Sequence, residues 1–343
     1  MGRLKHVGII AWCVGIAVFI GLALWSGVHA VGDAFASVGW GLALVVLTRI
    51  ATVAVAGAGW WCLLPATGRV RLRVAVLLRF IREAVNTLLP LTQVGGDIVG
   101  ARLLTFWAVP GSLAAASVII DVLVQAVTQF LFAVLGLVTL IALGVDKTVA
   151  VIAATSLAVA APALIGFYLV QGSAGHRLLR TLLVRLKGHG NWGVLGTVDA
   201  VYQSLSLIYT QRGNLVASNL VHMIGWLIGV LEVYIVLSCM GYAVTIGEAL
   251  VIESLVQAVR GAAFVIPSAL GAQEAGLILL CGMFGIPPDQ ALALSLIKRA
   301  ADLVVGVPGL VALQILEGGR VTTMFSRRQR QPQISSGVRS QGR

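Results

Sequence analysis

The chain has 343 residues, of which 59% are hydrophobic and only 11% are charged, and its mean hydropathy is +0.98. A soluble protein carries about 25% charged residues, so a soluble globular fold is excluded and most of the chain is expected to lie in lipid. The four cysteines all lie in apolar stretches, which excludes a disulfide-stapled secreted scaffold. In a membrane protein, the basic residues behind the net charge of +11 indicate first which loops face the cytoplasm.

Six apolar runs are long enough to cross a bilayer as helices, since one crossing needs about 20 residues. In chain order they cover residues 7–25, 38–64, 112–144, 148–170, 214–241 and 290–316. The first run has an alternative interpretation as a signal peptide, because Val28-His29-Ala30 resembles a cleavage site. The run is longer than the apolar core of a signal peptide, so a membrane span is favoured.

Two further apolar stretches, 74–106 and 248–286, are interrupted by charged residues, proline and glycine, and cannot be simple spans. Each half is too short to cross alone. We therefore expect each stretch to form a re-entrant hairpin, in which two short helices enter the membrane and return to the same side. The breaks are predicted at Pro90, Gly95 and Gly96 in the first hairpin and at Pro267 and Gly271 in the second.

Basic residues gather in four segments that are predicted to face the cytoplasm. These are the N-terminus, residues 65–82, the loop 171–213 and the tail 318–343, which together hold 18 of the 24 Lys and Arg residues. Both termini are therefore expected in the cytoplasm. We expect one transmembrane domain over residues 1–317, an amphipathic cytoplasmic loop at 171–213, and a disordered basic tail over 318–343.

The two interrupted stretches resemble each other. In both, an acid follows the proline by seven residues: Asp97 follows Pro90, and Glu274 follows Pro267. Three spans separate the stretches, so the two hairpins are expected to enter from opposite sides, as in an inverted-repeat transporter. Broken helices are tolerated in lipid only where they line a cavity or lie inside protein. The alternative is that both prolines are ordinary kinks and both acids only cap helices.

Several charged residues lie within apolar segments, where an unpaired charge costs about 2.5–3.5 kcal/mol on insertion scales. Lys298, Arg299 and Asp302 are spaced to cluster on one side of the last span. Arg49 has two candidate partners, Glu232 and Asp121, and for this residue packing explains the pattern as well as function does. The candidate substrate-binding residues are Arg82, Glu83, Asn86, Asp97, Arg102, Arg260, Gln273, Glu274, Lys298, Arg299 and Asp302.

The second hairpin gives the most specific expectation about contacts. A hairpin brings Arg260 and Glu274 to similar depth, and Arg299 is expected near the centre of the last span. We therefore expect Arg260 and Arg299 to face the cavity lined by this hairpin, close to Glu274. The sequence contains no catalytic, phosphate-loop, cofactor or metal-binding motif, so neither enzymatic activity nor a cofactor is expected. The basic residues follow topology, and nucleic-acid binding has no support.

Both hairpin stretches carry residues of a known family. The segments Arg82-Glu83-Ala84-Val85-Asn86-Thr87-Leu88-Leu89-Pro90, Gln93–Asp97 and Ala101–Leu104 resemble the first signature of the lysylphosphatidylglycerol synthase/flippase membrane-domain superfamily. The segments Phe264–Pro267, Gly271–Glu274, Ala291–Arg299 and Asp302–Pro308 resemble its second signature. The resemblance covers residues 1–317 and is nearest to the L-type members encoded with hopanoid-biosynthesis enzymes.

The resemblance implies a multi-pass protein of the bacterial inner membrane with a lipid-translocating fold and a role linked to hopanoids. Synthase members carry an aminoacyl-transferase domain after the membrane part, and this chain is expected to lack lysyl transfer. We expect it to move a polar-headed lipid, either an anionic phospholipid or a hopanoid, between leaflets. Arg82, Arg260, Lys298 and Arg299 would hold the headgroup, while Asp97 and Glu274 would hold these bases or a cationic group. The alternative is a non-catalytic scaffold that recruits lipid-synthesis enzymes through its basic face.

Overall fold

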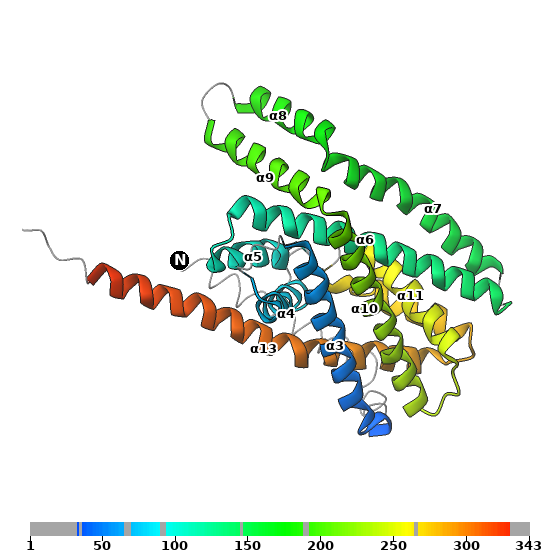
Figure 1. The fold of residues 1–343 in the computed structure, drawn as a ribbon. Helices are drawn as coiled ribbons and strands as arrows, with labels where there is room; N and C mark the ends of the chain where they lie inside the picture. Colours follow the sequence, from blue (N-terminus) through cyan, green and yellow to red (C-terminus); the bar gives the residue numbers. More distant parts are fainter. Residues whose placement is uncertain are drawn as a thin grey trace, which may run out of the picture.

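The computed structural model describes residues 33, 36–64, 70–89, 94–144, 147–187, 192–263 and 267–329, and in these ranges it contains helices and no strand. The α-helices are α3 (Gly41–Leu63), α4 (Leu72–Leu88), α5 (Gly95–Leu104), α6 (Gly111–Ala142), α7 (Lys147–Val170), α8 (Ser173–Lys187), α9 (Trp192–Thr210), α10 (Arg212–Cys239), α11 (Ile246–Ala262), α12 (Ala272–Gly282) and α13 (Pro288–Gln329) (Figure 1). Two 3-10 turns, η1 (Thr105–Trp107) and η3 (Pro267–Ala269), lie between helices. The predicted all-α fold class is confirmed.

Among the described residues, five helices are long and apolar enough to cross a membrane: α3, α6, α7, α10 and the part of α13 up to Gly318. They coincide with five of the six predicted spans, and the predicted span at 7–25 lies outside the described residues. These helices are apolar around most of their circumference, which suits a lipid environment. The last helix differs from the prediction, because α13 continues to Gln329, beyond residue 316 and into the segment predicted to be a disordered tail.

Each interrupted stretch forms two helices that pack against each other. In the first, α4 is followed by α5, and in the second, α11 is followed by η3 and α12. Pro90 lies outside the described residues, whereas Pro267 begins η3. Ser268 and Ala269 have φ values of 51° and 49°, a left-handed conformation that non-glycine residues seldom adopt. The chain therefore turns sharply at the second predicted break, as the proline and glycine pattern indicates.

The helices after the two breaks follow the same register. An offset of 177 residues separates the start of α5 at Gly95 from that of α12 at Ala272, and the start of α6 at Gly111 from that of α13 at Pro288. The same offset relates Asp97 to Glu274, each of which lies in the first turn of its helix. The two units therefore share a short helix with an N-terminal acid, a turn, and a long apolar helix.

The interior consists of the hairpins enclosed by the long helices. One cluster of buried hydrophobic side chains is formed by α3, α6, α10, α11, α12 and α13, and a second is formed by α3 to α6. α4 packs against α3, α5 and α13, so the first hairpin touches the last long helix. Figure 1 shows α13 running past α4 and α3. In the second hairpin, α11 packs against α6 and α10, and α12 packs against α13, so both hairpins contact the long helices.

The helices α7, α8 and α9 form an arm beside α6 (Figure 1). α7 exposes large apolar side chains along its length, with Val159 72% exposed, as suits a helix surrounded by lipid. Two contacts tie α9 back to the end of α7: the rings of Tyr168 and Tyr209 meet edge to face, and the hydroxyl of Tyr209 donates to Gln171 Oε1 at 2.7 Å. His176 on α8 lies 2.6 Å from Asp199 on α9. The loop predicted at 171–213 is therefore mainly two helices, of which α8 is amphipathic.

Candidate functional site

The first hairpin is held together by a buried guanidinium. Arg82 on α4 is only 1% exposed, and its Nη2 lies 2.7 Å from Asp97 Oδ1 in the first turn of α5. Its Nη1 donates to Asp121 Oδ2 on α6 at 2.8 Å, and its guanidinium carbon lies 4.6 Å from the centre of the Trp60 ring. Arg82 therefore joins the hairpin to α6 and α3.

Glycine allows the two helices of this hairpin to approach closely. A Cβ atom on Gly96 would collide with the backbone carbonyl oxygen of Arg82, and one on Gly100 would lie 2.5 Å from the Arg82 side chain. The backbone N–H of Gly96 donates to Asn86 Oδ1 at 2.6 Å. The Asn86 side chain thus accepts a hydrogen bond from one of the N–H groups at the start of α5, which have no partner within the helix.

Asp121 is the common partner of several basic groups. This carboxylate is fully buried, and it contacts Arg82, Arg79 at 3.4 Å and His222 at 3.1 Å. Arg79 also donates to Gln125 at 2.7 Å, while its own Nε, which is buried, has no partner among the described residues. His222 lies on α10, so its contact with Asp121 ties α10 to α6. The network fixes the rotation of α4, α6 and α10 relative to one another.

The second hairpin uses the same pair of chemical groups. Arg299 on α13 places Nη2 2.7 Å and Nε 2.9 Å from Glu274 Oε1, in the first turn of α12. Ser295 donates to the same oxygen at 2.8 Å, and Gln273 donates to the Ser295 hydroxyl at 2.8 Å. The other oxygen of Glu274 accepts the backbone N–H of Gly271 at 2.7 Å. The predicted pairing of Arg299 with Glu274 is confirmed.

The two hairpins meet at their breaks. The hydroxyl of Ser268, in the second break, donates to the backbone carbonyl of Thr87 at 2.7 Å, and Thr87 lies in the last turn of α4. Arg299 reaches the same segment, because its Nη1 lies 3.4 Å from the carbonyl oxygen of Ser268. A site formed at this junction would therefore contain groups from both units.

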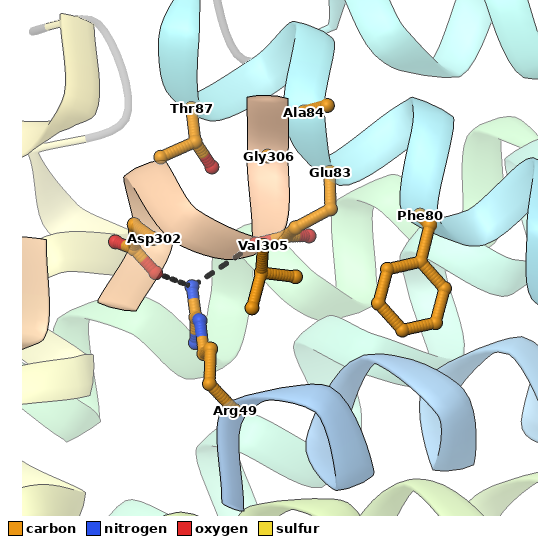
Figure 2. A pocket seen from close by; sticks show the side chains of 8 residues that line it. All are labelled: Arg49, Phe80, Glu83, Ala84, Thr87, Asp302, Val305 and Gly306. Carbon is orange, nitrogen blue, oxygen red and sulfur yellow. Dashed lines mark hydrogen bonds and ion pairs between the residues drawn. The ribbon is translucent and has the colours of Figure 1, made fainter. Parts of the chain in front are cut away.

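A small pocket lies beside this junction, between α3, α4 and α13 (Figure 2). Its polar groups are Arg49, Glu83, Thr87 and Asp302, and Phe80, Ala84, Val305 and Gly306 complete its lining. Figure 2 shows Arg49 reaching from α3 toward two acids on different helices: its Nη2 lies 2.5 Å from Asp302 Oδ1 and 3.3 Å from Glu83 Oε1. Arg49 therefore pairs with neither of its two predicted partners, Glu232 and Asp121, because α3 turns it toward α4 and α13.

The three charged residues of the last span do not cluster with one another. Lys298 contacts Glu253 on α11 and Glu232 on α10, Arg299 contacts Glu274 on α12, and Asp302 contacts Arg49 on α3. Helical spacing allows the predicted cluster, but opposite charges on four neighbouring helices provide closer partners. α13 is thereby connected by ion pairs to α3, α10, α11 and α12.

Two of the predicted site residues lie apart from this network. Arg102 pairs with Glu317 at 3.1 Å at the surface, where its side chain is 66% exposed. Arg260 is partly buried and forms no ion pair with a described residue, so the expected contact with Glu274 is not made. The remaining candidates fall into three groups of contacts. Arg82, Glu83, Asp97 and Asp302 are linked through Arg49, Arg79 and Asp121, and Asn86 binds the N-terminus of α5 beside them. Gln273 and Glu274 lie with Arg299, and Lys298 lies with Glu232 and Glu253. Their role in binding a substrate stays a prediction.

The sequence patterns missed Ser268 and Ser295. Neither residue carries a charge, and a small hydroxyl in an apolar helix is usually a packing residue. Two signals were available: Ser268 directly follows Pro267, and Ser295 precedes Arg299 by one helical turn on the same face. Within the described part of the chain, no group of three or more His, Cys, Asp or Glu side chains is arranged to hold a metal ion.

These features define a multi-pass α-helical membrane protein with charged side chains concentrated at two helical hairpins. Residues 12–309 match the family described as the lysylphosphatidylglycerol synthase TM region, and the chain therefore belongs to this family. No curated protein and no solved structure matches the chain. Membership places the chain in the membrane family of lipid synthases and flippases and indicates interaction with membrane lipids.

Proposed function

We propose that this protein moves a polar-headed lipid between the leaflets of a membrane and is not an enzyme. The observation that carries the proposal is the junction of the two hairpin breaks, where Ser268 contacts Thr87 and Arg299 lies close to both Ser268 and Glu274. Broken helices inside a membrane protein commonly form substrate sites, and matching breaks in two repeats are their best indicator. The family match agrees with a lipid as the substrate.

The chemistry of the site favours a headgroup that carries a phosphate. The planar guanidinium presents paired N–H donors that fit a phosphate as well as a carboxylate. In the structure, Asp97 forms an ion pair with Arg82, and Glu274 forms one with Arg299. A lipid phosphate would replace one carboxylate on its arginine, and the released acid would repel the phosphate again once the headgroup had moved. We therefore propose an anionic phospholipid, while a hopanoid-linked role rests on sequence resemblance alone.

The topology that we propose has six spans, two re-entrant hairpins and both termini in the cytoplasm of a bacterial inner membrane. Three candidate spans, α6, α7 and α10, lie between the hairpins. An odd number of crossings reverses direction, so α4–α5 would open toward one side and α11–α12 toward the other. This arrangement would allow alternating access to the junction between them.

The experiment that tests the proposal measures the movement of a fluorescent anionic phospholipid across vesicles reconstituted with the full chain. Asp97→Asn and Glu274→Gln keep side-chain size but remove the charge, so each should lower the rate by about tenfold or more, which corresponds to about 1.4 kcal/mol in the barrier. Chemical reduction of the fluorophore on the outer leaflet reports the rate. Lys298 and its two acids are left unchanged in these variants.

The matched control removes residues 330–343, which follow α13. This deletion should leave the rate unchanged, because it affects neither hairpin. Rates equal to wild type in both charge variants would refute transport through the hairpins. A truncated chain that transports normally but fails to support lipid synthesis in cells would instead favour the scaffold function.

A further inference from the structure

Three buried ionisable side chains from three helices form a group that does not include Asp97 or Glu274. Glu232 lies on α10, Glu253 on α11 and Lys298 on α13, and they are 2%, 2% and 4% exposed. Lys298 Nζ lies 2.9 Å from Glu253 Oε2 and 3.4 Å from Glu232 Oε2. We call these residues the Lys298 triad. If all three groups were ionised, the triad would carry one uncompensated negative charge.

The two carboxylates of the triad are not equivalent. Glu253 accepts a hydrogen bond from Lys298 and a second, at 2.7 Å, from Gln257. Glu232 has only the 3.4 Å contact with Lys298, and neither of its oxygens accepts a hydrogen bond from a described residue. An ionised carboxylate is stabilised by such donors, and burial without them favours the protonated acid. Glu232 is therefore the member that is better suited to hold a proton.

The surrounding charges do not compensate the triad. Among the described residues outside the triad, the charged groups with the largest effect on Glu232 are Arg49 on α3 and Asp302 on α13. Arg49 is already shared between Asp302 and Glu83, at 2.5 and 3.3 Å, so its charge is opposed by two acids. On α6, Asp121 is held by Arg82 and Arg79. Arg260, two turns beyond Glu253 on α11, has no ion pair with a described residue, but it is not among the groups that act on Glu232.

We propose that the Lys298 triad is a proton-binding site in which Glu232 carries an exchangeable proton. In the loaded form Glu232 is a neutral carboxylic acid, and Lys298 pairs with Glu253 alone. On release, the proton passes from the Glu232 carboxyl group to water, and two carboxylates then share one ammonium. The proton site rests on the triad alone, whereas its use in transport rests on the proposed function.

The position of Lys298 would connect this site to the hairpins. Lys298 precedes Arg299 on α13, and Arg299 holds Glu274 at the start of α12. Release of the proton leaves Glu232 negatively charged, so Lys298 is attracted more strongly toward α10. Lys298 lies in the same turn of α13 as Arg299, and this attraction therefore pulls on the turn that holds the second hairpin. A proton gradient would in this way favour access to the junction from one side of the membrane over access from the other.

Infrared difference spectroscopy of the full chain in lipid membranes tests the proton site without any transport measurement. A protonated carboxylic acid has a carbonyl stretch that an ionised carboxylate lacks. The wild-type spectrum should contain such a band that changes between acidic and alkaline pH, and Glu232→Gln should remove it. Lys298→Gln should enlarge the band, because both acids then lack their base. Asp289→Asn, at an exposed position in the first turn of α13, is the control and should leave the band unchanged.

The same variants provide the outcomes that would overturn the proposal. A band that persists in Glu232→Gln would place the proton elsewhere, and a wild-type protein without the band would show that Glu232 is ionised. Glu232→Gln imitates the proton-loaded state, so it must also insert and fold, and a variant that fails to do so would contradict the proposal. If wild type shows the Glu232 band but moves no lipid, the proton site stands and the proposed function fails.

Discussion

At the scale of single residues, nearly every buried charge of the described chain has a partner on another helix. Arg82 and Arg299 each hold an acid in the first turn of a short helix, where the helix dipole also favours a negative charge. A buried pair contributes little net stability, since desolvation offsets the attraction. Breaking such a pair from one side is more costly, because it leaves an uncompensated charge in a medium that solvates it poorly.

The pair Arg299–Glu274 makes this argument measurable. Glu274→Ala should reduce the free energy of unfolding by about 3–5 kcal/mol, because it leaves Arg299 buried without its acid. Glu274→Ala combined with Arg299→Ala should cost less than the single change, since both charges are gone. Thermal unfolding of the purified variants in detergent measures both. Equal losses in the single and double variants would show that the two residues contribute independently of their pairing.

At the scale of elements, each hairpin depends on how closely its two helices approach. α5 lies against α4 at Gly96 and Gly100, directly over Arg82, and this approach brings Asp97 within hydrogen-bonding distance of the guanidinium. A larger residue there would separate the helices and remove the pair at the same time. The hairpin geometry and its charge pair are thus one structural feature.

Gly96→Ala should therefore destabilise the protein and slow lipid transport by about tenfold or more, although alanine is the better helix former by about 1 kcal/mol. Gly282→Ala, at the last residue of α12, is the matched control, because a Cβ atom there meets nothing within 4 Å. The two variants are compared by unfolding temperature and by transport rate. A stabilised and fully active Gly96→Ala protein would refute the close packing of α5 on α4.

Hydrophobicity predicted the positions of the elements well, and it predicted their contacts less well. The spans at 38–64, 112–144, 148–170 and 214–241 agree with α3, α6, α7 and α10 because a long apolar run has few other stable forms. Partners across helices depend on how each helix is rotated, and a helix that is apolar all round carries little information about its rotation. For this reason the partners of Arg49 could not be predicted, whereas the Arg299–Glu274 pair followed from two groups on adjacent elements.

At the scale of the whole molecule, two units with the same register meet where their helices are broken. The first unit contributes α4, α5 and α6, and the second contributes α11, α12 and α13. Contacts between the units occur at Thr87 and Ser268, and between α4 and α13 beside the Arg49 pocket of Figure 2. α6 also packs against α11, and apolar side chains from both units share one buried cluster. Movement of one unit relative to the other would therefore have to rearrange apolar packing as well as these polar contacts.

The opposed orientation that we propose for the two units predicts a labelling pattern. A single cysteine at Asp33, Lys147 or Tyr242 should react with a membrane-impermeant maleimide added to intact cells, because these connections lie on the periplasmic side of the proposed topology. A cysteine at Arg71, His189 or Ser335 should react only after the cells are opened. Labelling of His189 in intact cells would contradict three crossings between the hairpins.

The central claim is that the junction of the two hairpins must open for a lipid to pass. A cysteine pair at Thr87 and Ser268, introduced into a chain in which Cys13, Cys62, Cys239 and Cys281 are replaced, permits this claim to be tested directly. Cross-linking should stop phospholipid movement in reconstituted vesicles, and a reductant should restore it, while each single-cysteine chain should be unaffected by the same treatment. Undiminished transport by the fully cross-linked protein would contradict the account.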